Sequence, residues 1–327
     1  MSLPETLSSP DAFHAAFIAG LERQLAEPGL GTFILVLANA SFDADLWPRL
    51  KGAIAERFEA LSVEVRDALR SGARLTYPED DLAVFLKLMA MGIEAIRPTD
   101  YRRIGPWEMQ YTPMRALRPA RASGVKATGV MPPEFNRSGF HFNKPFLQKE
   151  VLWQGDLLHR PCRLLYNKFP FAPWHGLLVP EPEREHPQRL TQEQHLYAWH
   201  VARALGTPLP GFGLSYNSFG AYASVNQLHF QTFQRSSPLP IEAADWRHNG
   251  GDSAYPADCL AFDDALDAWL HLAHLHERNM AYNLIYVPGR LYCLARRTQG
   301  AYELPAWCAG QAWYEMAGGV VAFSQAE

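Results

Sequence analysis

The stretch YNSFGAYASVNQLHFQTF, residues 216–233, decides the expected fold and contains the candidate chemistry of this chain. Its last part alternates in polarity, because apolar residues separate Gln227, His229 and Gln231. Successive side chains of a β-strand point to opposite faces, so these three polar side chains would share one face. The apolar residues between them would anchor the strand in a core. The stretch therefore predicts a strand that holds one imidazole between two carboxamides.

Further strand and helix patterns lie on both sides of this stretch. We expect strands in CRLLYN, GLLVPEP and FGLSYN, and a hairpin in AYNLIYVPGRLYCLARR with its turn at Pro288 and Gly289. Thr191 and Gln194 form a capping-box signature, so a helix is expected to follow. Residues 262–278 have the apolar spacing of another helix. Separate helices beside hairpins predict an α+β fold, with helices packed on an antiparallel sheet.

The first hundred residues are expected to be mainly helical. Residues 43–70 place apolar side chains at three- and four-residue steps, and residues 81–92 repeat this spacing over a shorter length. The segment GTFILVLANA is compatible with a strand and with the start of a buried helix. Residues 106–150 are rich in Pro, Arg and Gly, which predicts irregular chain laid over a scaffold.

The length allows one large domain or two. The 327 residues are 48% hydrophobic and 20% charged, which is typical of a globular protein. We predict a helical region at residues 1–105 and a sheet-containing domain at residues 106–327. The halves of that domain would be roughly 106–240 and 241–327.

The charge balance excludes some partners. A net charge of −4 argues against binding nucleic acid through bulk charge, which needs a basic footprint. A small anionic ligand stays compatible, because a local cluster of hydrogen-bond donors is enough to bind it. The four cysteines form no CxxC pair, so we expect no disulfide framework, and we predict neither a metal nor a cofactor.

The N-terminal sequence and the apolar runs bear on location. The first residues, MSLPETLSSPDAFHAAF, lack the basic and long apolar segments of a signal peptide. The longest apolar run, residues 33–38, is too short to span a bilayer. A cytoplasmic protein without a membrane partner is therefore expected.

A neutral imidazole beside amide donors suits chemistry at phosphorus. Histidine has an ordinary pKa of about 6.5, so its ring is unprotonated near pH 7. Nucleotidyl transfer needs a nucleophile at the α-phosphorus and donors for the phosphate oxygens. His229 is the candidate nucleophile, and Gln231 is a candidate donor on the same face. Because a lone histidine on a strand is usually structural, the residues alone leave both interpretations of His229 open.

Other polar residues add candidate contacts to substrate. Asn217 ends the expected strand FGLSYN, and Ser218 and Ser224 lie on the turn of small residues between it and the polar strand. The backbone of such a turn can bind an anion. Asn167 and Lys168 end another expected strand, where a carboxamide and an ammonium group could meet ribose hydroxyls and phosphate.

Two stretches of the chain resemble the histidine-triad-like nucleotidyltransferases. They are YNKFPFAPWHGLLVPEPEREHPQRLT and YNSFGAYASVNQLHFQTF. The similarity is greatest to the GDP-L-galactose phosphorylases and the diadenosine tetraphosphate phosphorylases, and galactose-1-phosphate uridylyltransferase is more distant. The positions that match the family pattern are Asn167, Pro173, His175 and residues 177–180 in the first stretch, and Asn217, Ser224, His229 and Gln231 in the second.

The resemblance implies a fold and a role for each matched residue. It implies a histidine-triad-like antiparallel sheet in which His229 takes the nucleotidyl group and Gln231 bonds the bound phosphate. Ser224 and Asn217 would hold phosphate oxygens, and Asn167 would lie at the ribose. The implied partners are a nucleotide or nucleotide sugar and inorganic phosphate.

Basic residues between the two regions are further candidates. The stretch YTPMRALRPARAS is similar to the arginine-bearing opening of the uridylyltransferases, which makes Arg115, Arg118 and Arg121 phosphate-binding candidates; surface charge is the alternative. Lys144, with His141, could approach phosphate or belong to a polar loop.

One position departs from the family pattern. Gln227 occupies the place of the first histidine of the triad, so a zinc site there is not expected. The last position is Gln231, as in the transferases, which favours transfer or phosphorolysis over hydrolysis. The predicted enzyme is a nucleotidyltransferase that acts on a nucleoside diphosphate sugar or a dinucleoside polyphosphate through a nucleotidyl-histidine. A silent nucleotide-binding regulatory protein and a nucleotide hydrolase are the alternatives. Base, acceptor and oligomeric state stay open.

Overall fold

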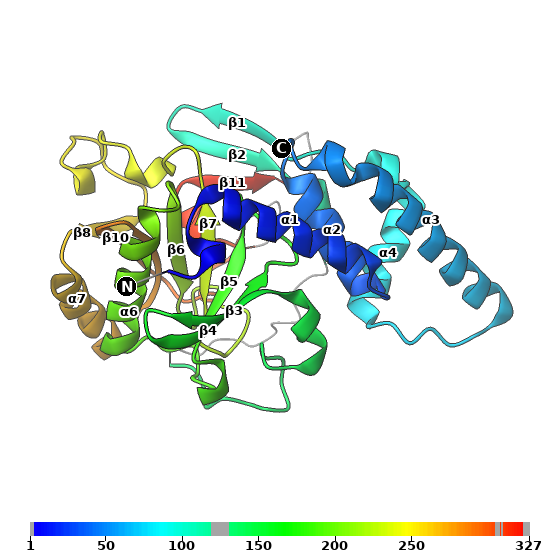
Figure 1. Cartoon of the computed structure of the whole chain (residues 1–327). Coiled ribbons are helices and arrows are strands. Elements are labelled where there is room, and N and C mark those ends of the chain that lie inside the picture. The colour runs from blue at the N-terminus through cyan, green and yellow to red at the C-terminus, as the bar shows by residue number, and fades with distance from the viewer. Residues whose placement is uncertain (1–2, 119–130, 305–307, 309, 323–327) are drawn as a thin grey trace.

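The computed structural model describes residues 3–118, 131–304, 308 and 310–322 (Figure 1). The strands of this part are β1 (Asp100–Ile104), β2 (Trp107–Tyr111), β3 (Val151–Leu157), β4 (Arg160–Tyr166), β5 (Gly176–Pro180), β6 (Phe212–Asn217), β7 (Phe230–Gln234), β8 (Asp258–Phe262), β9 (Ala281–Val287), β10 (Arg290–Arg296) and β11 (Gly319–Ala322). The α-helices are α1 (Pro10–Ala26), α2 (Leu30–Phe42), α3 (Trp47–Ser71), α4 (Glu79–Met91), α5 (Pro113–Ala116), α6 (Gln192–Gly206), α7 (Ala265–Glu277) and α8 (Trp313–Met316).

The strands of the described residues form a large and a small sheet. The large sheet has the order β3-β4-β5-β7-β6-β9-β10-β8, and its neighbouring strands are antiparallel. The small sheet has the order β1-β2-β11, with β2 and β11 parallel. An antiparallel sheet with packed helices and a helical N-terminal region confirms the predicted α+β fold class.

Local sequence signals explain where several helices begin and end. The side chain of Ser9 accepts a hydrogen bond from the backbone N–H of Ala12, 3.1 Å away, at the start of α1. The predicted capping box of α6 is present, because Thr191 and Gln194 each accept a bond from the other's backbone N–H. Helix α3 stops at Gly72, whose φ of 69° suits glycine.

The segment GTFILVLANA is helical and lies within α2. All residues of this helix from Thr32 to Phe42 are buried, so it has no solvent-exposed stripe. A helix that is covered on all sides needs no polar face, so its apolar residues do not follow a helical period. Packing against α1, α3 and α4 therefore decided the open alternative between strand and helix.

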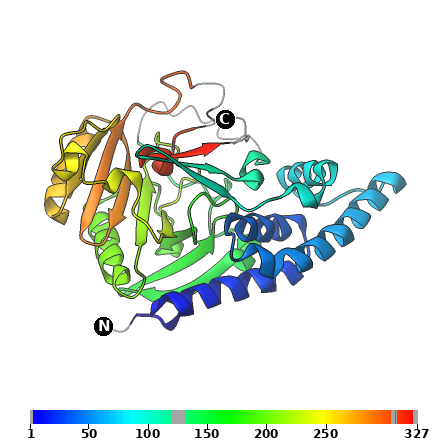
Figure 2. The ribbon, with the colours of Figure 1, turned by 90° about the horizontal axis from the view of Figure 1, so that it is seen from above.

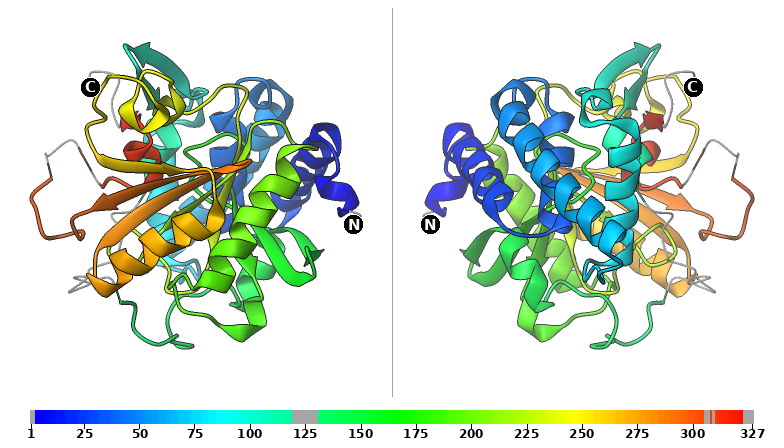
Figure 3. Two further views of the ribbon diagram at one scale, coloured as in Figure 1. Left: turned by 90° about the vertical axis from the view of Figure 1, so that its left-hand side faces the viewer. Right: turned by 90° about the vertical axis from the view of Figure 1, so that its right-hand side faces the viewer.

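The two faces of the large sheet have different characters. Residues such as Leu178, Phe230 and Leu214 belong to the main core cluster together with residues of α6 and α7, which lie over this face (Figure 3). On the opposite face, smaller apolar clusters around Phe142 and around Trp313 leave the middle of the sheet polar. This polar region carries the candidate site.

The N-terminal helices pack beside the sheets (Figure 2). The hydroxyl of Tyr166 in β4 donates a 2.6 Å hydrogen bond to the carbonyl oxygen of Phe17 in α1. A Cβ atom on Gly20 would lie 2.0 Å from that hydroxyl, so the close approach of α1 to the sheet requires glycine there. The helices and the sheet share one core cluster. The division at residue 105 and the halves of the second domain stay predictions.

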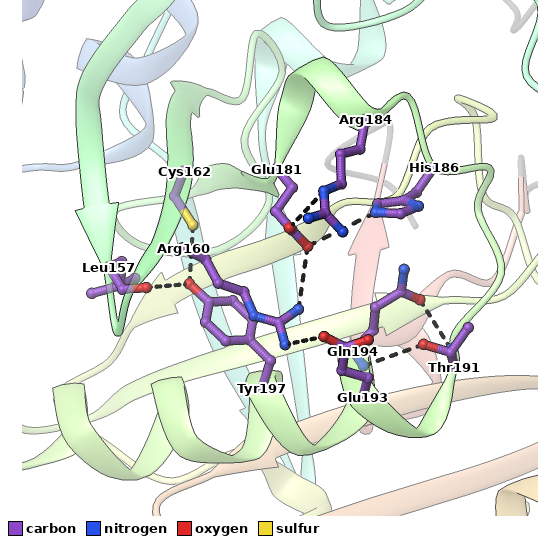
Figure 4. Close-up of polar contacts among 10 residues, drawn as sticks. All are labelled: Leu157, Arg160, Cys162, Glu181, Arg184, His186, Thr191, Glu193, Gln194 and Tyr197. Atoms are coloured by element: carbon purple, nitrogen blue, oxygen red, sulfur yellow. Dashed lines mark hydrogen bonds and ion pairs between the residues drawn. The ribbon is translucent and has the colours of Figure 1, made fainter.

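Charged residues anchor the loop that follows β5 (Figure 4). Arg160 of β4 pairs with Glu181, at 3.3 Å, and with Glu193 of α6, at 2.7 Å. Glu181 also pairs with Arg184, at 3.0 Å. These contacts hold residues 181–190 against the end of the sheet, where they support the site described below.

Three predicted segments need correction. Residues 107–111, placed in irregular chain, form β2, which pairs with β1 across a turn at Gly105. The helix expected from Phe262 begins at Ala265, because Phe262 ends β8 and Asp264 caps the helix.

The third correction concerns the polar strand itself. It begins at Phe230, whereas the sequence predicted that it includes Gln227 and His229. The backbone N–H groups of Leu228 and His229 bond to His186 and Gln188 of the 181–190 loop instead of to a neighbouring strand. Within the described residues, none of the helices is both long and apolar enough to cross a membrane.

Candidate active site

A row of side chains crosses the polar face of the large sheet. In an antiparallel pair, residues directly opposite each other point to the same face. Gln231 of β7 lies opposite Leu177 of β5 and Ser215 of β6, and Ser215 lies opposite Ile285 of β9. One register step further, Asn217 lies opposite Asn283. The row is therefore apolar at both ends and polar in its middle.

His229 stands just before β7, and its hydrogen bond identifies the tautomer. Nδ1 lies 2.8 Å from the carbonyl oxygen of Gln227, which can only accept, so Nδ1 donates. In the neutral ring Nε2 then carries the lone pair, as a nucleophilic imidazole requires. The His229 ring packs edge-on against the Phe142 ring, with the ring centroids 5.0 Å apart. The backbone N–H of His229 donates to Gln188 Oε1 over 3.0 Å. His229 is 4% exposed, so a phosphorus atom would reach its ring only after the residues packed around the ring had moved.

The side chain of Gln231 is oriented by two donors. The backbone N–H of Phe171 donates to Nδ1 of His175 over 3.2 Å, so the neutral His175 ring carries its hydrogen on Nε2. That Nε2–H donates to Gln231 Oε1 over 2.9 Å, and the indole N–H of Trp313 donates to the same oxygen over 2.9 Å. Both contacts end on the oxygen, which leaves the amide nitrogen of Gln231 as a donor toward a ligand.

His175 stays neutral throughout the physiological range. It is 1% exposed, and burial lowers its pKa to about 3, with a smaller lowering from the charge of Arg115 and an opposing effect from the bond to Gln231. A neutral ring can give Gln231 only the single bond described, so the arrangement does not change with pH above this value.

Asn217 is held in the same manner. Its Oδ1 accepts bonds from Asn283 Nδ2, at 2.6 Å, and from the backbone N–H of Trp313, at 3.1 Å. Arg296 donates to Asn283 Oδ1 over 2.9 Å, which fixes the orientation of that amide in turn. Asn217 therefore also presents its amide nitrogen as the remaining donor.

The other residues predicted from the polar stretch lie in different surroundings. Gln227 uses both ends of its amide on backbone, since it accepts from Phe142 N and donates to Pro182 O. Ser218 is buried and accepts a bond from Tyr282 N at 2.9 Å. Ser224 is exposed in the loop before Gln227.

Asn167 and Lys168 diverge at the end of β4. Asn167 Oδ1 accepts from the backbone N–H of Phe169, and its Nδ2 lies 3.3 Å from His175 Nε2, beside the site. Lys168 instead forms an ion pair with Asp81 of α4. Its ammonium group thus serves the contact between the sheet and the N-terminal helices.

Of the basic candidates, Arg115 lies closest to the described network. Its guanidinium is 4.3 Å from the centroid of the Phe171 ring and donates to Phe169 O over 3.0 Å. Arg118 lies 5.9 Å from the Phe169 ring. Lys144 is half-buried and donates to a backbone carbonyl of its own loop. Arg121 lies outside the described residues.

The sequence did not point to some residues that organise the site. His175 was part of the first matched stretch, but only the structure connects it to Gln231. Gln188, Asn283 and Trp313 were not predicted as site residues, because no local pattern assigns a role to a single polar or aromatic side chain. The described residues contain no group of three or more His, Cys, Asp or Glu side chains placed to hold a metal ion.

Comparison with known proteins finds a family model that covers the polar stretch. Residues 121–233 match the family model for the GDPGP1-like, N-terminal domain. GDP-D-glucose phosphorylase 1 of Danio rerio is 38% identical over 112 residues, which are 34% of this chain and 32% of that protein. GDP-L-galactose phosphorylase 1 of Arabidopsis thaliana is 38% identical over 126 residues, 34% of this chain and 28% of that protein. The chain thus spans about a third of the length of the curated relatives it matches.

Among solved structures, the chain is similar in fold to yeast Ap4A phosphorylase Apa2. It is 15% identical and covers 77% of this chain and 89% of its own, with a TM-score of 0.48. The family model and the curated relatives confirm the predicted resemblance to the GDP-L-galactose phosphorylases: residues 121–233 match a GDPGP1-like N-terminal domain.

Proposed function

We propose that this chain is a phosphorylase-type nucleotidyltransferase that acts on a nucleoside diphosphate sugar. The relatives named above are phosphorylases of GDP-D-glucose and GDP-L-galactose, which favours a GDP-hexose over a dinucleoside polyphosphate. The observation that carries the proposal is the arrangement of His229 beside Gln231 and Asn217. The first presents Nε2 as the unprotonated nitrogen, and the other two present amide donors.

The reaction has two displacements at the α-phosphorus. In the first, the Nε2 lone pair of His229 forms a P–N bond while the bond from the α-phosphorus to the bridging oxygen breaks, and hexose 1-phosphate leaves. In the second, an oxygen of inorganic phosphate attacks the same phosphorus. The P–N bond breaks, its electron pair returns to Nε2, and GDP is released.

The amide donors would stabilise the charge on the phosphorus centre. Negative charge is spread over the non-bridging oxygens as the phosphorus passes between nucleophile and leaving group. Donors that are already oriented in a buried site stabilise that charge without first reorganising. Gln231 and Asn217 have this property, because their oxygens are held by other residues.

A second candidate function is nucleotide binding without transfer. It is favoured by the 4% exposure of His229, since a ring that stays covered cannot attack phosphorus. The two functions differ in one observable, the formation of a covalent nucleotidyl-protein.

The test uses GDP-glucose and GDP-galactose labelled at the α-phosphorus, without acceptor, followed by denaturing electrophoresis. We expect the wild type to retain an acid-labile label and to lose it, as GDP, when phosphate is added. His229→Asn should not become labelled, because the shorter amide can still donate to the Gln227 carbonyl but has no nucleophilic nitrogen. His200→Asn is the matched control, since His200 is exposed on α6, over the opposite face of the sheet, and should label normally.

Labelled diadenosine tetraphosphate and UDP-hexose, run in parallel, test the substrate class. Preference for either would overturn the assignment to GDP-hexoses. Tight binding of GDP, with no label from any donor, would establish the silent alternative.

A further inference from the structure

Trp313 contacts both amide donors of the candidate site from outside the residues that match the family model. Its indole N–H donates to Gln231 Oε1 over 2.9 Å, and its backbone N–H donates to Asn217 Oδ1 over 3.1 Å. Trp313 is the first residue of α8, and the first N–H groups of a helix have no partner inside the helix. The same residue can therefore serve two strands, β6 and β7.

Packing and a helix cap hold Trp313 in place. It is 0% exposed, and its ring stacks on Phe233 with centroids 5.0 Å apart and planes 16° apart. Glu315 caps the start of α8 by accepting a bond from Ala312 N over 2.8 Å. Its hydrogen bonds therefore come from a residue that packing holds in place.

These bonds saturate both amide oxygens. A carbonyl oxygen has two lone pairs. Those of Gln231 Oε1 are used by Trp313 and His175, and those of Asn217 Oδ1 by Trp313 and Asn283. Rotating either amide by 180° would place N–H groups against two donors, so both amides are locked with their nitrogen atoms available to acceptors.

We propose that Trp313 is a positioning residue that locks Gln231 and Asn217 as paired donors for the phosphate oxygens of a nucleoside diphosphate. The inference rests on the proposed function for the identity of the ligand. It assigns to the C-terminal segment a part in the site that the match at residues 121–233 does not include.

A double-mutant cycle between Trp313→Phe and Gln231→Ala tests this. Phenylalanine keeps an aromatic ring on Phe233 and removes the indole N–H. The readouts are the dissociation constant of GDP by calorimetry and the single-turnover rate of label transfer. We expect Trp313→Phe alone to weaken GDP binding several-fold and to slow transfer by about tenfold to a hundredfold, because misplaced groups lose rate steeply. In the Gln231→Ala background the same change should have a much smaller effect.

Trp246→Phe is the matched control. Trp246 is also buried and also donates its indole N–H, to Pro240 O over 2.8 Å, but it packs with Trp107 and Tyr255 away from the row. It should lose comparable stability while its GDP binding and transfer rate stay at the wild-type level. Should Trp313→Phe fail to fold, Gln231→Glu replaces it: a carboxylate keeps both accepted bonds but removes the donor, so the fold should remain and GDP binding should fall.

The outcomes separate the two claims. A labelled wild type with an unchanged Trp313→Phe variant, or equal effects in both backgrounds, overturns the positioning role and leaves the proposed function standing. A wild type that binds GDP but is never labelled overturns the proposed function, and the cycle in GDP binding still decides the role of Trp313. A wild type without GDP binding overturns both.

Discussion

Replacing His175 by its two amide analogues should separate stability from activity. Asparagine places a carboxamide near Nδ1, and glutamine places one near Nε2. His175→Asn can therefore still accept from Phe171 N but no longer donates to Gln231, whereas His175→Gln does the opposite. In the native protein both bonds are present, at 3.2 and 2.9 Å.

The expected magnitudes follow from which group is left without a partner. In His175→Gln the buried N–H of Phe171 has no acceptor, which costs about 1–3 kcal/mol of folding free energy. In His175→Asn the Gln231 oxygen keeps its bond from Trp313, so the loss of stability from unpaired groups is smaller. One orienting bond of about 1 kcal/mol is lost, which corresponds to about fivefold in transfer rate. Glutamine should thus be the less stable variant and asparagine the less active one.

Urea unfolding and single-turnover label transfer measure the two effects on the same preparations. Equal losses of stability and rate in both variants would refute the reasoning, because they would mean that the ring acts by filling space.

The lowered pKa of His175 adds a pH dependence to this experiment. Because the folded pKa lies near 3, below the ordinary 6.5, the unfolded chain binds the extra proton between these values. This contribution to stability is complete above pH 6.5 and is lost as the pH falls toward 3, with a slope of up to about 1.4 kcal/mol per pH unit. His175→Gln lacks the titrating group. Its stability should therefore fall less than that of the wild type between pH 6.5 and 5, and an identical fall in both proteins would contradict the assignment.

Three other perturbations test the surrounding structure. Glu150→Gln should stabilise the protein increasingly as the pH rises. Burial raises the pKa of Glu150 to about 7, and its contribution to stability is lost as the pH rises through that value. Urea unfolding at pH 5 and pH 8 measures this, and the same gain in stability at both pH values would argue against it. Glu108→Gln should lower the free energy of unfolding by about 3–5 kcal/mol, because it leaves the buried Arg235 guanidinium without its bidentate carboxylate partner at 3.0 and 2.6 Å. A loss below about 1 kcal/mol in denaturant unfolding would show that the ion pair is replaceable. Gly20→Ala should lower the free energy of unfolding by about 1–3 kcal/mol, because its methyl group forces α1 away from Tyr166. Thermal unfolding should show the loss, and the double variant with Tyr166→Phe should recover part of it. A Gly20→Ala variant as stable as the wild type would show that the helix accommodates the methyl group without strain.

Features that depend on neighbouring residues in the chain were predictable. The capping box at Thr191 and Gln194 and the hairpin at Pro288 and Gly289 depend on a few residues and formed as expected. The alternation around His229 also identified the polar stretch, because strand periodicity is a local property. Even there, the strand itself begins at Phe230, three residues after Gln227, since the partners of residues 228 and 229 come from a loop.

What the site needs from distant residues was decided only by tertiary packing. Trp313 meets Gln231 across 82 positions of sequence and His175 meets it across 56, and no local pattern specifies which donor will face an amide. Packing also turned Lys168 toward Asp81, 87 positions away, and made a helix of the apolar run in α2. The sequence by itself determined the strand-like alternation and the residue types that suit phosphate chemistry. The directions in which the Gln231 and Asn217 amides point were set by contacts between segments far apart in the chain, because a carboxamide has two nearly isosteric ends and only its hydrogen-bond partners distinguish them.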